Sequence, residues 1–163
     1  MVGEQVSAQK KRGYHSTTHP PRGRVKKILV VEDESAISSL LGEVLKDWDC
    51  DVLIATNGRE GLDFLKTERV DGIMLDLEMP IMDGCTMLDE LRWQGDHTPV
   101  IVMSGGVDSN VLRNMVKEGA QGFLQKPFTL QTLHTQFQEC FVSAKKIGSF
   151  KGARTSRGRI LNS

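Results

Sequence analysis

Five short apolar runs, spaced along the middle of the 163-residue chain, constrain its fold more than any other feature. Within each run the apolar residues follow one another without alternating with polar ones. A strand with one face in solvent alternates, whereas a strand buried on both faces reads as a continuous apolar run. The runs therefore predict buried strands at residues 28–31, 52–55, 73–75, 100–103 and 122–124.

Longer segments with a helical period lie between these runs and after the last one. The clearest spans residues 37–48, where apolar residues recur at the i, i+3, i+4 and i+7 spacing of an amphipathic helix. The same period recurs at 111–116 and 130–141, and in weaker form at 62–65 and 85–91. Each predicted strand is therefore followed by a predicted helix.

This alternation, (βα)5, predicts an α/β fold with a five-stranded parallel sheet, doubly wound so that helices cover both faces. Five strands suit the flavodoxin-like strand order 2-1-3-4-5. In such sheets ligands bind outside the carboxyl ends of the strands, near the switch point between strands 1 and 3. We therefore expect the functional side chains at that edge.

The charges divide the chain into three parts, although 21 Lys and Arg residues balance 21 Asp and Glu residues overall. Residues 1–27 carry a net charge of +6 and residues 143–163 another +6, whereas residues 28–142 carry −12. The two ends are also poor in apolar residues, so they cannot bury enough surface to offset the entropy of ordering. We expect a flexible basic N-terminal arm at 1–25, a globular domain at 26–142 and a flexible basic C-terminal tail at 143–163.

Composition and cysteine spacing exclude several classes of protein. With 39% hydrophobic and 26% charged residues, the chain as a whole is not disordered. No apolar run reaches the roughly 18–20 residues of a spanning helix, and the basic N-terminal segment lacks the apolar stretch of a secretory signal. Cys50, Cys85 and Cys140 have no metal or redox spacing and fit buried thiols in a reducing compartment. We therefore expect a cytoplasmic protein.

Polar side chains follow four of the five predicted strands. Glu32 and Asp33 follow the first strand, Asp76 the third, Ser104 the fourth and Lys126 the fifth. Each alone has an ordinary explanation: an acid can cap the next helix, a serine can bond its own backbone, and a lysine can lie in solvent. Together they are harder to explain in that way, because clustered acids repel one another unless a cation joins them.

A divalent cation and a phosphoryl group would suit this cluster. Mg²⁺ binds carboxylates and backbone carbonyls, and a lysine or a hydroxyl beside it can bind phosphoryl oxygens. Asp76, on the central strand, could attack phosphorus and form an acyl phosphate. A metal ion held by Asp33 and Asp76, with Glu32 as a candidate third ligand, would neutralise the phosphoryl oxygens.

At these residues the sequence resembles the receiver domain of two-component response regulators, and in particular a stand-alone, CheY-like receiver. The resemblance rests on Val-Val-Glu-Asp-Glu at 30–34, D-x-x-M-P-x-M-D-G at 76–84, Met-Ser-Gly at 103–105 and Lys-Pro-Phe at 126–128. The order and separation of these stretches fit the family, and the similarity covers about residues 26–142.

The resemblance implies a role for each reacting residue. Asp76 is the phosphoacceptor, and Lys126 pairs with the phosphoryl group. Ser104 is the switch hydroxyl that moves toward the phosphoryl group, and Phe123 is the aromatic residue that rotates inward with it. The peptide bond between Lys126 and Pro127 is cis in the family.

The resemblance also implies a metal site for Mg²⁺, or Mn²⁺ in its place. The ligands are Asp33, Asp76 and the backbone carbonyl of Glu78. Glu32 stands where Asp is commoner in the family, so its contact with the metal is either direct or through water. Glu78 would also place a carboxylate near the path of attacking water, and we hypothesise that it sets the hydrolysis rate of the phosphorylated form; the alternative is a carboxylate that points into solvent.

Gly105 and Gly106 follow the switch hydroxyl, and two explanations are open for them. Small residues here leave access for a phosphodonor, and glycine tolerates unusual φ values. Alternatively, the pair simply loosens the loop before a helix that begins near Asp108.

The resemblance implies protein partners. The phosphoryl donor is a sensor histidine kinase or a histidine phosphotransfer protein. The signal passes to a downstream protein through a changed surface formed by residues 111–117, Phe123 and 130–141. Because the 21 residues after 142 are too few for an output domain, we expect a single-domain response regulator in a two-component phosphorelay; the alternative is a receiver fragment of a longer regulator.

Two further classes of function are weighed against this one. The basic arms could bind nucleic acid or an anionic membrane by salt-dependent attraction, although they lack the amphipathic or aromatic pattern of a dedicated binding element. An aspartate-nucleophile phosphatase would carry its nucleophile after the first strand in a D-x-D arrangement, which Glu32-Asp33-Glu34 does not match. We therefore expect a phosphoacceptor that assists its own phosphorylation and dephosphorylation, not a turnover enzyme.

Overall fold

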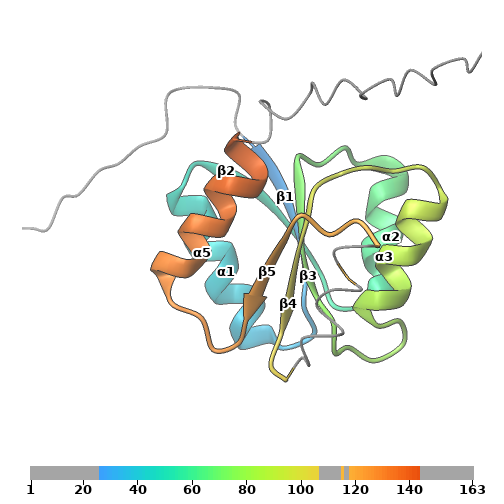
Figure 1. Ribbon diagram of the computed structural model, residues 1–163, viewed down its shortest axis with the longest axis horizontal. Helices are drawn as coiled ribbons and strands as arrows, with labels where there is room; N and C mark the ends of the chain where they lie inside the picture. The colour runs from blue at the N-terminus through green and yellow to red at the C-terminus, as the bar shows by residue number, and fades with distance from the viewer. Residues whose placement is uncertain (1–25, 107–114, 116–117, 144–163) are drawn as a thin grey trace, which may run out of the picture.

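The computed structural model describes residues 26–106, 115 and 118–143, and these form a five-stranded sheet (Figure 1). The strands lie in the order β2-β1-β3-β4-β5, and every neighbouring pair is parallel. The predicted fold class, flavodoxin-like with the order 2-1-3-4-5, is therefore confirmed. The strands are β1 (Lys26–Val31), β2 (Cys50–Ala55), β3 (Gly72–Asp76), β4 (Val100–Ser104) and β5 (Gly122–Gln125).

Helices cover both faces of the sheet (Figure 1). On one face lie α1 (Ser35–Asp47) and α5 (Leu130–Phe137), which continues into a π-helical segment, η1 (Gln138–Val142). On the other face lie α2 (Gly58–Thr67) and α3 (Gly84–Trp93). The helix predicted at 111–116 lies outside the described residues except for Met115, and so do the predicted arm at 1–25 and nearly all of the predicted tail.

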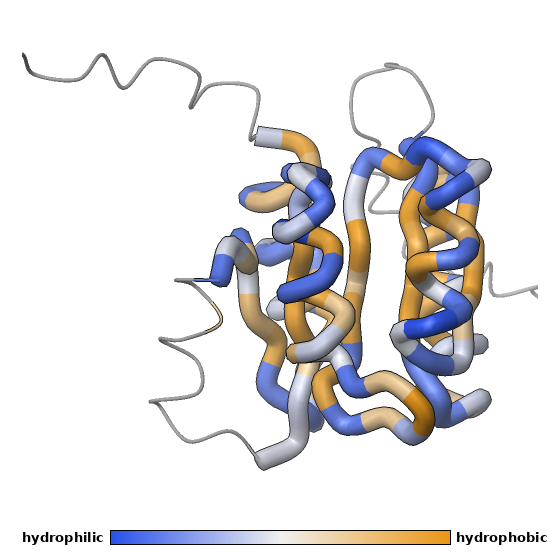
Figure 2. Tube along the Cα trace, turned by 90° about the vertical axis from the view of Figure 1, so that its right-hand side faces the viewer, coloured by the Kyte–Doolittle hydropathy of each residue, from blue (hydrophilic) through white to orange (hydrophobic). Residues whose placement is uncertain are grey.

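The sheet is buried on both faces, as its continuous apolar runs predict. Residues 28–31 and 100–103 are each no more than 1% exposed. Successive strand residues face two separate clusters: Ile73 and Leu75 pack with residues of α2 and α3, whereas Met74 packs with residues of α1 and α5. In Figure 2 apolar and polar residues alternate along the helices, as expected for helices that bury one face.

Three of the helices begin with a side-chain cap. Asn57, Asp83 and Thr129 each accept a hydrogen bond from the backbone amide three residues later. Helix α1 is different, because Glu34 occupies its N-cap position without making a side-chain cap bond. The ordinary explanation of this acid as a helix cap is therefore wrong for Glu34.

The helix predicted at 130–141 is present, but its last turn widens into η1. Hydrogen bonds in a π-helix span five residues instead of four, and the apolar period alone does not reveal this change. Cys140 and Phe141 are both buried, at 6% and 5% exposed. The ring of Phe141 packs over Gly72 at the start of β3, where an added Cβ would come within 2.5 Å of the ring.

The state of the cysteines and the lengths of the helices can be read from the described residues. All three cysteines are free; Cys50 and Cys140 are buried, and Cys85 is half-buried. Within the part of the chain that the structure describes, no helix combines the length and the apolar character that crossing a bilayer would require.

Candidate functional site

The carboxyl ends of four strands meet at one edge of the sheet and bring the predicted site residues together. Glu32 and Asp33 follow β1, Asp76 ends β3, Ser104 ends β4 and Lys126 follows β5. The parallel register places Asp76 opposite Met103, and Ser104 opposite Gln125. Because the strands are parallel and in register, residues separated by up to 94 positions in sequence share one site.

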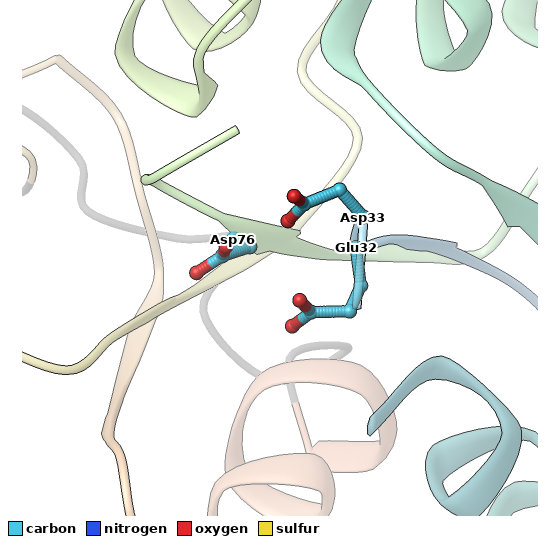
Figure 3. A group of neighbouring side chains, drawn as sticks. All are labelled: Glu32, Asp33 and Asp76. Carbon is cyan, nitrogen blue, oxygen red and sulfur yellow. The ribbon is translucent and has the colours of Figure 1, made fainter. Parts of the chain in front are cut away.

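Three carboxylates form the centre of the site (Figure 3). Glu32, Asp33 and Asp76 each contribute an oxygen atom that lies within 4.8 Å of the other two. Glu32 and Asp76 are buried, at 1% and 3% exposed, whereas Asp33 is exposed at the mouth of the site. The cluster is therefore closed on the side of the sheet and open toward solvent.

Lys126 supplies the positive charge that faces these acids. Its Nζ lies 2.7 Å from Oε2 of Glu32 and 3.1 Å from Oδ1 of Asp76. The side chain is only 19% exposed, so the ordinary explanation of a solvated surface lysine is wrong. The peptide bond between Lys126 and Pro127 is cis, as the family resemblance implied.

Burial shifts the ionisation of all three paired groups. It raises the pKa of Asp76 and the pKa of Glu32, and the hydrogen bonds from Lys126 only partly offset these rises. Burial alone would lower the pKa of Lys126, but its hydrogen bonds to Glu32 and Asp76 raise that pKa above the ordinary value. Burial thus disfavours the charged forms of both carboxylates, and their contacts favour the charged form of Lys126.

Ser104 lies at the rear of the site and is fully buried. Its Oγ donates a hydrogen bond to Oε1 of Glu78 at 3.3 Å and accepts one from the backbone amide of Gly106 at 3.4 Å. The backbone carbonyl of Ser104 accepts a 2.8 Å bond from the amide of Lys126. The ordinary explanation for a serine here, a bond to its own backbone loop, thus holds in part, alongside a contact with Glu78 that the sequence did not predict.

The three clustered carboxylates and Lys126 line a cleft of about 430 Å³. The three clustered carboxylates carry more negative charge than the ammonium group of Lys126 balances, and Glu34 and Glu78 add two further carboxylates to the lining. Carboxylate oxygens are ligands that Mg²⁺ prefers, so the donor set fits that ion. The cleft is lined by Glu32, Asp33, Glu34, Ile37, Asp76, Glu78, Gly105 and Lys126.

Gly84 is a structural residue of the site whose importance the sequence analysis missed. It starts α3, and its amide donates a 3.2 Å bond to the carbonyl of Leu77. An added Cβ would overlap the carbonyl oxygen of Asp76 and lie 2.9 Å from Cα of Leu77. The Asp-Gly pair at 83–84, used above only as the end of the D-x-x-M-P-x-M-D-G stretch, therefore marks the close approach of α3 to the backbone of the central acid.

Gly105 and Gly106, which follow Ser104, differ from Gly84 because no close contact surrounds them among the described residues. The φ angle of neither Gly105 nor Gly106 lies in the left-handed region, so neither position uses the tolerance of glycine for such angles. Both residues are exposed, and an added Cβ would meet no atom of the described residues within 4 Å. Among the residues that the structure describes, nothing crowds these two positions, as the access explanation requires.

Phe123 is half-buried on β5, where it packs against the α2–α3 side of the core. Its backbone amide donates a 3.2 Å bond to the side chain of Gln136 on α5. Its expected role as a switch residue stays a prediction.

Comparison with known proteins assigns the chain to a family. The model of the response regulator receiver domain matches residues 28–138. This protein belongs to that family. Receiver domains of response regulators act in two-component signalling, in which histidine kinases are the general source of phosphoryl groups.

Individual relatives agree with this assignment. The chain is 35% identical to the response regulator MprA of Mycolicibacterium vanbaalenii over 107 residues, which are 66% of this chain and 46% of MprA. It is 33% identical to the transcriptional regulatory protein CiaR of Streptococcus pneumoniae over 135 residues, 83% of this chain and 58% of CiaR. The structure of the chemotaxis response regulator CheY4 of Vibrio cholerae is similar, with 30% identity and a TM-score of 0.66 over 70% of this chain and 97% of that one.

The receiver accounts for only part of the curated relatives. This chain spans 23% of the transcription factor SKN7 of Candida albicans, and about half of MprA and CiaR. These relatives therefore contain long segments for which this chain offers no counterpart.

Proposed function

We propose that this receiver domain accepts a phosphoryl group on Asp76 from a phosphohistidine of a sensor histidine kinase or a histidine phosphotransfer protein. One observation carries the proposal: the buried carboxylate of Asp76 ends the central strand with Asp33 beside it and with the ammonium group of Lys126 3.1 Å away. This arrangement offers a nucleophilic oxygen, a position for a divalent cation and a cationic partner for a phosphoryl oxygen.

The transfer needs one bond to form and one to break. An oxygen of the Asp76 carboxylate attacks phosphorus in line with the leaving group, and the bond between phosphorus and the histidine nitrogen breaks. The imidazole keeps the electron pair and later takes up a proton. Lys126 then pairs with an oxygen of the phosphoryl group, and the hydroxyl of Ser104 donates to another.

Mg²⁺, or Mn²⁺, would be held by Asp33 and Asp76 together with the backbone carbonyl of Glu78, and it would supply neutralisation of the phosphoryl charge. The side chain of Glu32 already accepts bonds from Lys126 at 2.7 Å and from the amide of Glu34 at 3.2 Å. These bonds favour a contact of Glu32 with the metal through water over a direct one.

The output of this reaction is a changed binding surface, not a released product. Phosphorylation shifts an existing equilibrium between two conformations, because the phosphoryl group makes different contacts in each. We expect the change at Phe123, α5 and the segment at 111–117, where a downstream protein would bind. The free thiols of the three cysteines suit a reducing cytoplasm.

Incubation with Mg²⁺ and a small acyl-phosphate donor, followed by intact mass spectrometry, tests this proposal. We expect a single phosphoryl adduct on the wild-type chain, none on Asp76→Asn, and none when EDTA removes the metal. The matched control is Asp89→Asn, an exposed acid on α3, which should form the adduct normally. An adduct of equal yield on Asp76→Asn would refute the proposal, and so would the absence of any adduct on the wild type across several donors.

A further inference from the structure

The single hydrogen of the Ser104 hydroxyl is already in use. A serine hydroxyl has one hydrogen to donate, and here that hydrogen lies toward Oε1 of Glu78, with a distance of 3.3 Å between the two oxygens. The amide of Gly106 donates to the same hydroxyl oxygen. Ser104 is fully buried, and the described residues supply these two partners to its hydroxyl.

A phosphoryl group on Asp76 would need the same hydrogen. The hydroxyl cannot donate to Glu78 and to a phosphoryl oxygen at once, because it has a single hydrogen. The two acceptors, the carboxylate of Glu78 and the phosphoryl group, therefore compete for Ser104. Glu78 can compete for the Ser104 hydroxyl because it lies two residues after Asp76 and lines the same cleft.

We propose that Glu78 is a positioning residue that holds the Ser104 hydroxyl in the orientation of the unphosphorylated protein. On phosphorylation of Asp76, the hydroxyl must then give up its bond to Glu78 in order to donate to the phosphoryl group. The inference rests on the proposed function, since it concerns how the same site responds to its phosphoryl group. It goes beyond an effect of Glu78 on attacking water, because it predicts that Glu78 acts through Ser104 before any hydrolysis occurs.

Removal of Glu78 should therefore make the active orientation easier to reach. Two effects contribute: loss of the bond to Ser104, and loss of a negative charge near an anionic group. The first requires the serine hydroxyl and the second does not. A double-mutant cycle between Glu78 and Ser104 separates them.

The test uses the full chain and beryllofluoride, an inorganic mimic of a phosphoryl group, with saturating Mg²⁺. Titration calorimetry gives its dissociation constant for the wild type, Glu78→Ala, Ser104→Ala and the double variant. With Ser104 present, we expect Glu78→Ala to tighten binding about tenfold, as for a hydrogen bond to a charged group. In the Ser104→Ala background the same substitution should tighten binding by only about twofold to threefold, through charge alone. Equal factors in both backgrounds, or weaker binding by Glu78→Ala, would overturn the inference.

Two further variants separate the hydrogen bond from the charge. Glu78→Gln removes the charge but keeps an acceptor oxygen, so its affinity should lie closer to the wild type than to Glu78→Ala; an affinity equal to that of Glu78→Ala contradicts the inference. Glu34→Ala is the matched control, because Glu34 lines the same cleft without contacting Ser104, and it should show the charge effect only. If Asp76 accepts a phosphoryl group in the mass assay but the cycle shows no coupling, this inference fails and the proposed function stands.

Discussion

The carboxylate of Asp76 reduces the stability of the fold when it is charged. Burial raises its pKa in the folded protein, and the contacts with Lys126 do not fully compensate. As pH rises above the ordinary pKa of aspartate, the unfolded chain therefore releases its proton before the folded protein does. The unfolded state then binds fewer protons than the folded state, so the free energy of unfolding falls over that interval and stays lower at neutral pH.

Asp76→Asn should consequently stabilise the metal-free protein. At pH 7 in EDTA we expect its midpoint of thermal unfolding to exceed that of the wild type by about 2–5 °C. The difference should shrink as pH falls toward the ordinary pKa of aspartate, where the wild-type carboxyl is also protonated. Scanning calorimetry between pH 3.5 and pH 7 measures both effects.

The matched control is Asp63→Asn. Asp63 is exposed on α2, and its bond with Lys66 lowers its pKa, so removal of this charge should not raise the midpoint. A midpoint for Asp76→Asn at or below the wild-type value at pH 7 would contradict the argument.

Individual site residues were predictable where strand ends determine their place. Asp33, Asp76 and Lys126 follow buried runs, and parallel strands must bring such positions to one edge. The specific hydrogen-bonded pairs of side chains were not predictable. The bond of Lys126 to Glu32 joins residues 94 positions apart, and both this bond and the bond of Ser104 to Glu78 depend on side-chain rotamers.

At the scale of elements, the start of α3 supports the site through a close backbone approach. Gly84→Ala would force the new Cβ into the backbone at Asp76 and Leu77. We expect a loss of about 1–3 kcal/mol in the free energy of unfolding, together with slower phosphorylation, because Asp76 must move. Urea denaturation and the adduct mass assay measure the two effects.

Gly42→Ala provides the contrast. Gly42 is buried within α1, where an added Cβ would make only an ordinary contact of 3.5 Å with Ile54. This substitution should raise stability by roughly 0.5–1 kcal/mol through helix propensity. If Gly84→Ala were equally stabilising, the close approach would not limit this position.

The other end of α3 is tied to two loops by Arg92. Its guanidinium donates to the carbonyls of Asp96 at 2.7 Å, Thr98 at 2.9 Å and Gly119 at 2.9 Å. Arg92→Ala would leave these half-buried carbonyls without that donor, so we expect a loss of about 1–3 kcal/mol in urea denaturation. Because the contacts lie at the edge of the sheet away from the acids, phosphorylation of the folded variant should be unaffected.

The control for Arg92 is Arg69→Ala, which removes an exposed arginine and should change stability by less than about 0.5 kcal/mol. Equal losses for the two variants would show that the bonds of Arg92 do not stabilise these loops.

Elements were predictable to different degrees. The apolar run at residues 73–75 of β3 is continuous because both faces of the strand are buried, and this continuity identified the strand in the sequence. The π-helical turn of η1 was not predictable, because Cys140 and Phe141 also fit the apolar period of an α-helix.

For the whole molecule, the main electrostatic feature is the charge imbalance of the cleft. The chain is neutral overall, yet within the described part of the chain the ion pairs of the three clustered carboxylates are all made with Lys126. A divalent cation that binds the folded protein and not the unfolded chain must stabilise it by mass action. The strand order that creates this cluster was predictable from the sequence pattern. The burial of Glu32 and Asp76, which makes their negative charge unfavourable, was known only from the structure.

Mg²⁺ should therefore raise the free energy of unfolding. At a free concentration 100 times its dissociation constant we expect a gain of about 2.7 kcal/mol, measured by urea denaturation in Mg²⁺ and in EDTA. NaCl at the same ionic strength should produce little of this gain, and Asp33→Asn should lose most of it. A gain that is equal in NaCl, or unchanged in Asp33→Asn, would contradict a metal site at this cluster.

The most direct measurement is the chemical identity of residue 76 after phosphorylation. Borohydride reduces an aspartyl phosphate to homoserine, so treatment of the protein after incubation with Mg²⁺ and an acyl-phosphate donor, followed by digestion and tandem mass spectrometry, locates the acyl phosphate. We predict homoserine at Asp76 and at no other aspartate. Homoserine at a different aspartate, or an unreduced Asp76 in protein that carries the phosphoryl adduct, would contradict the assignment of Asp76 as the phosphoacceptor.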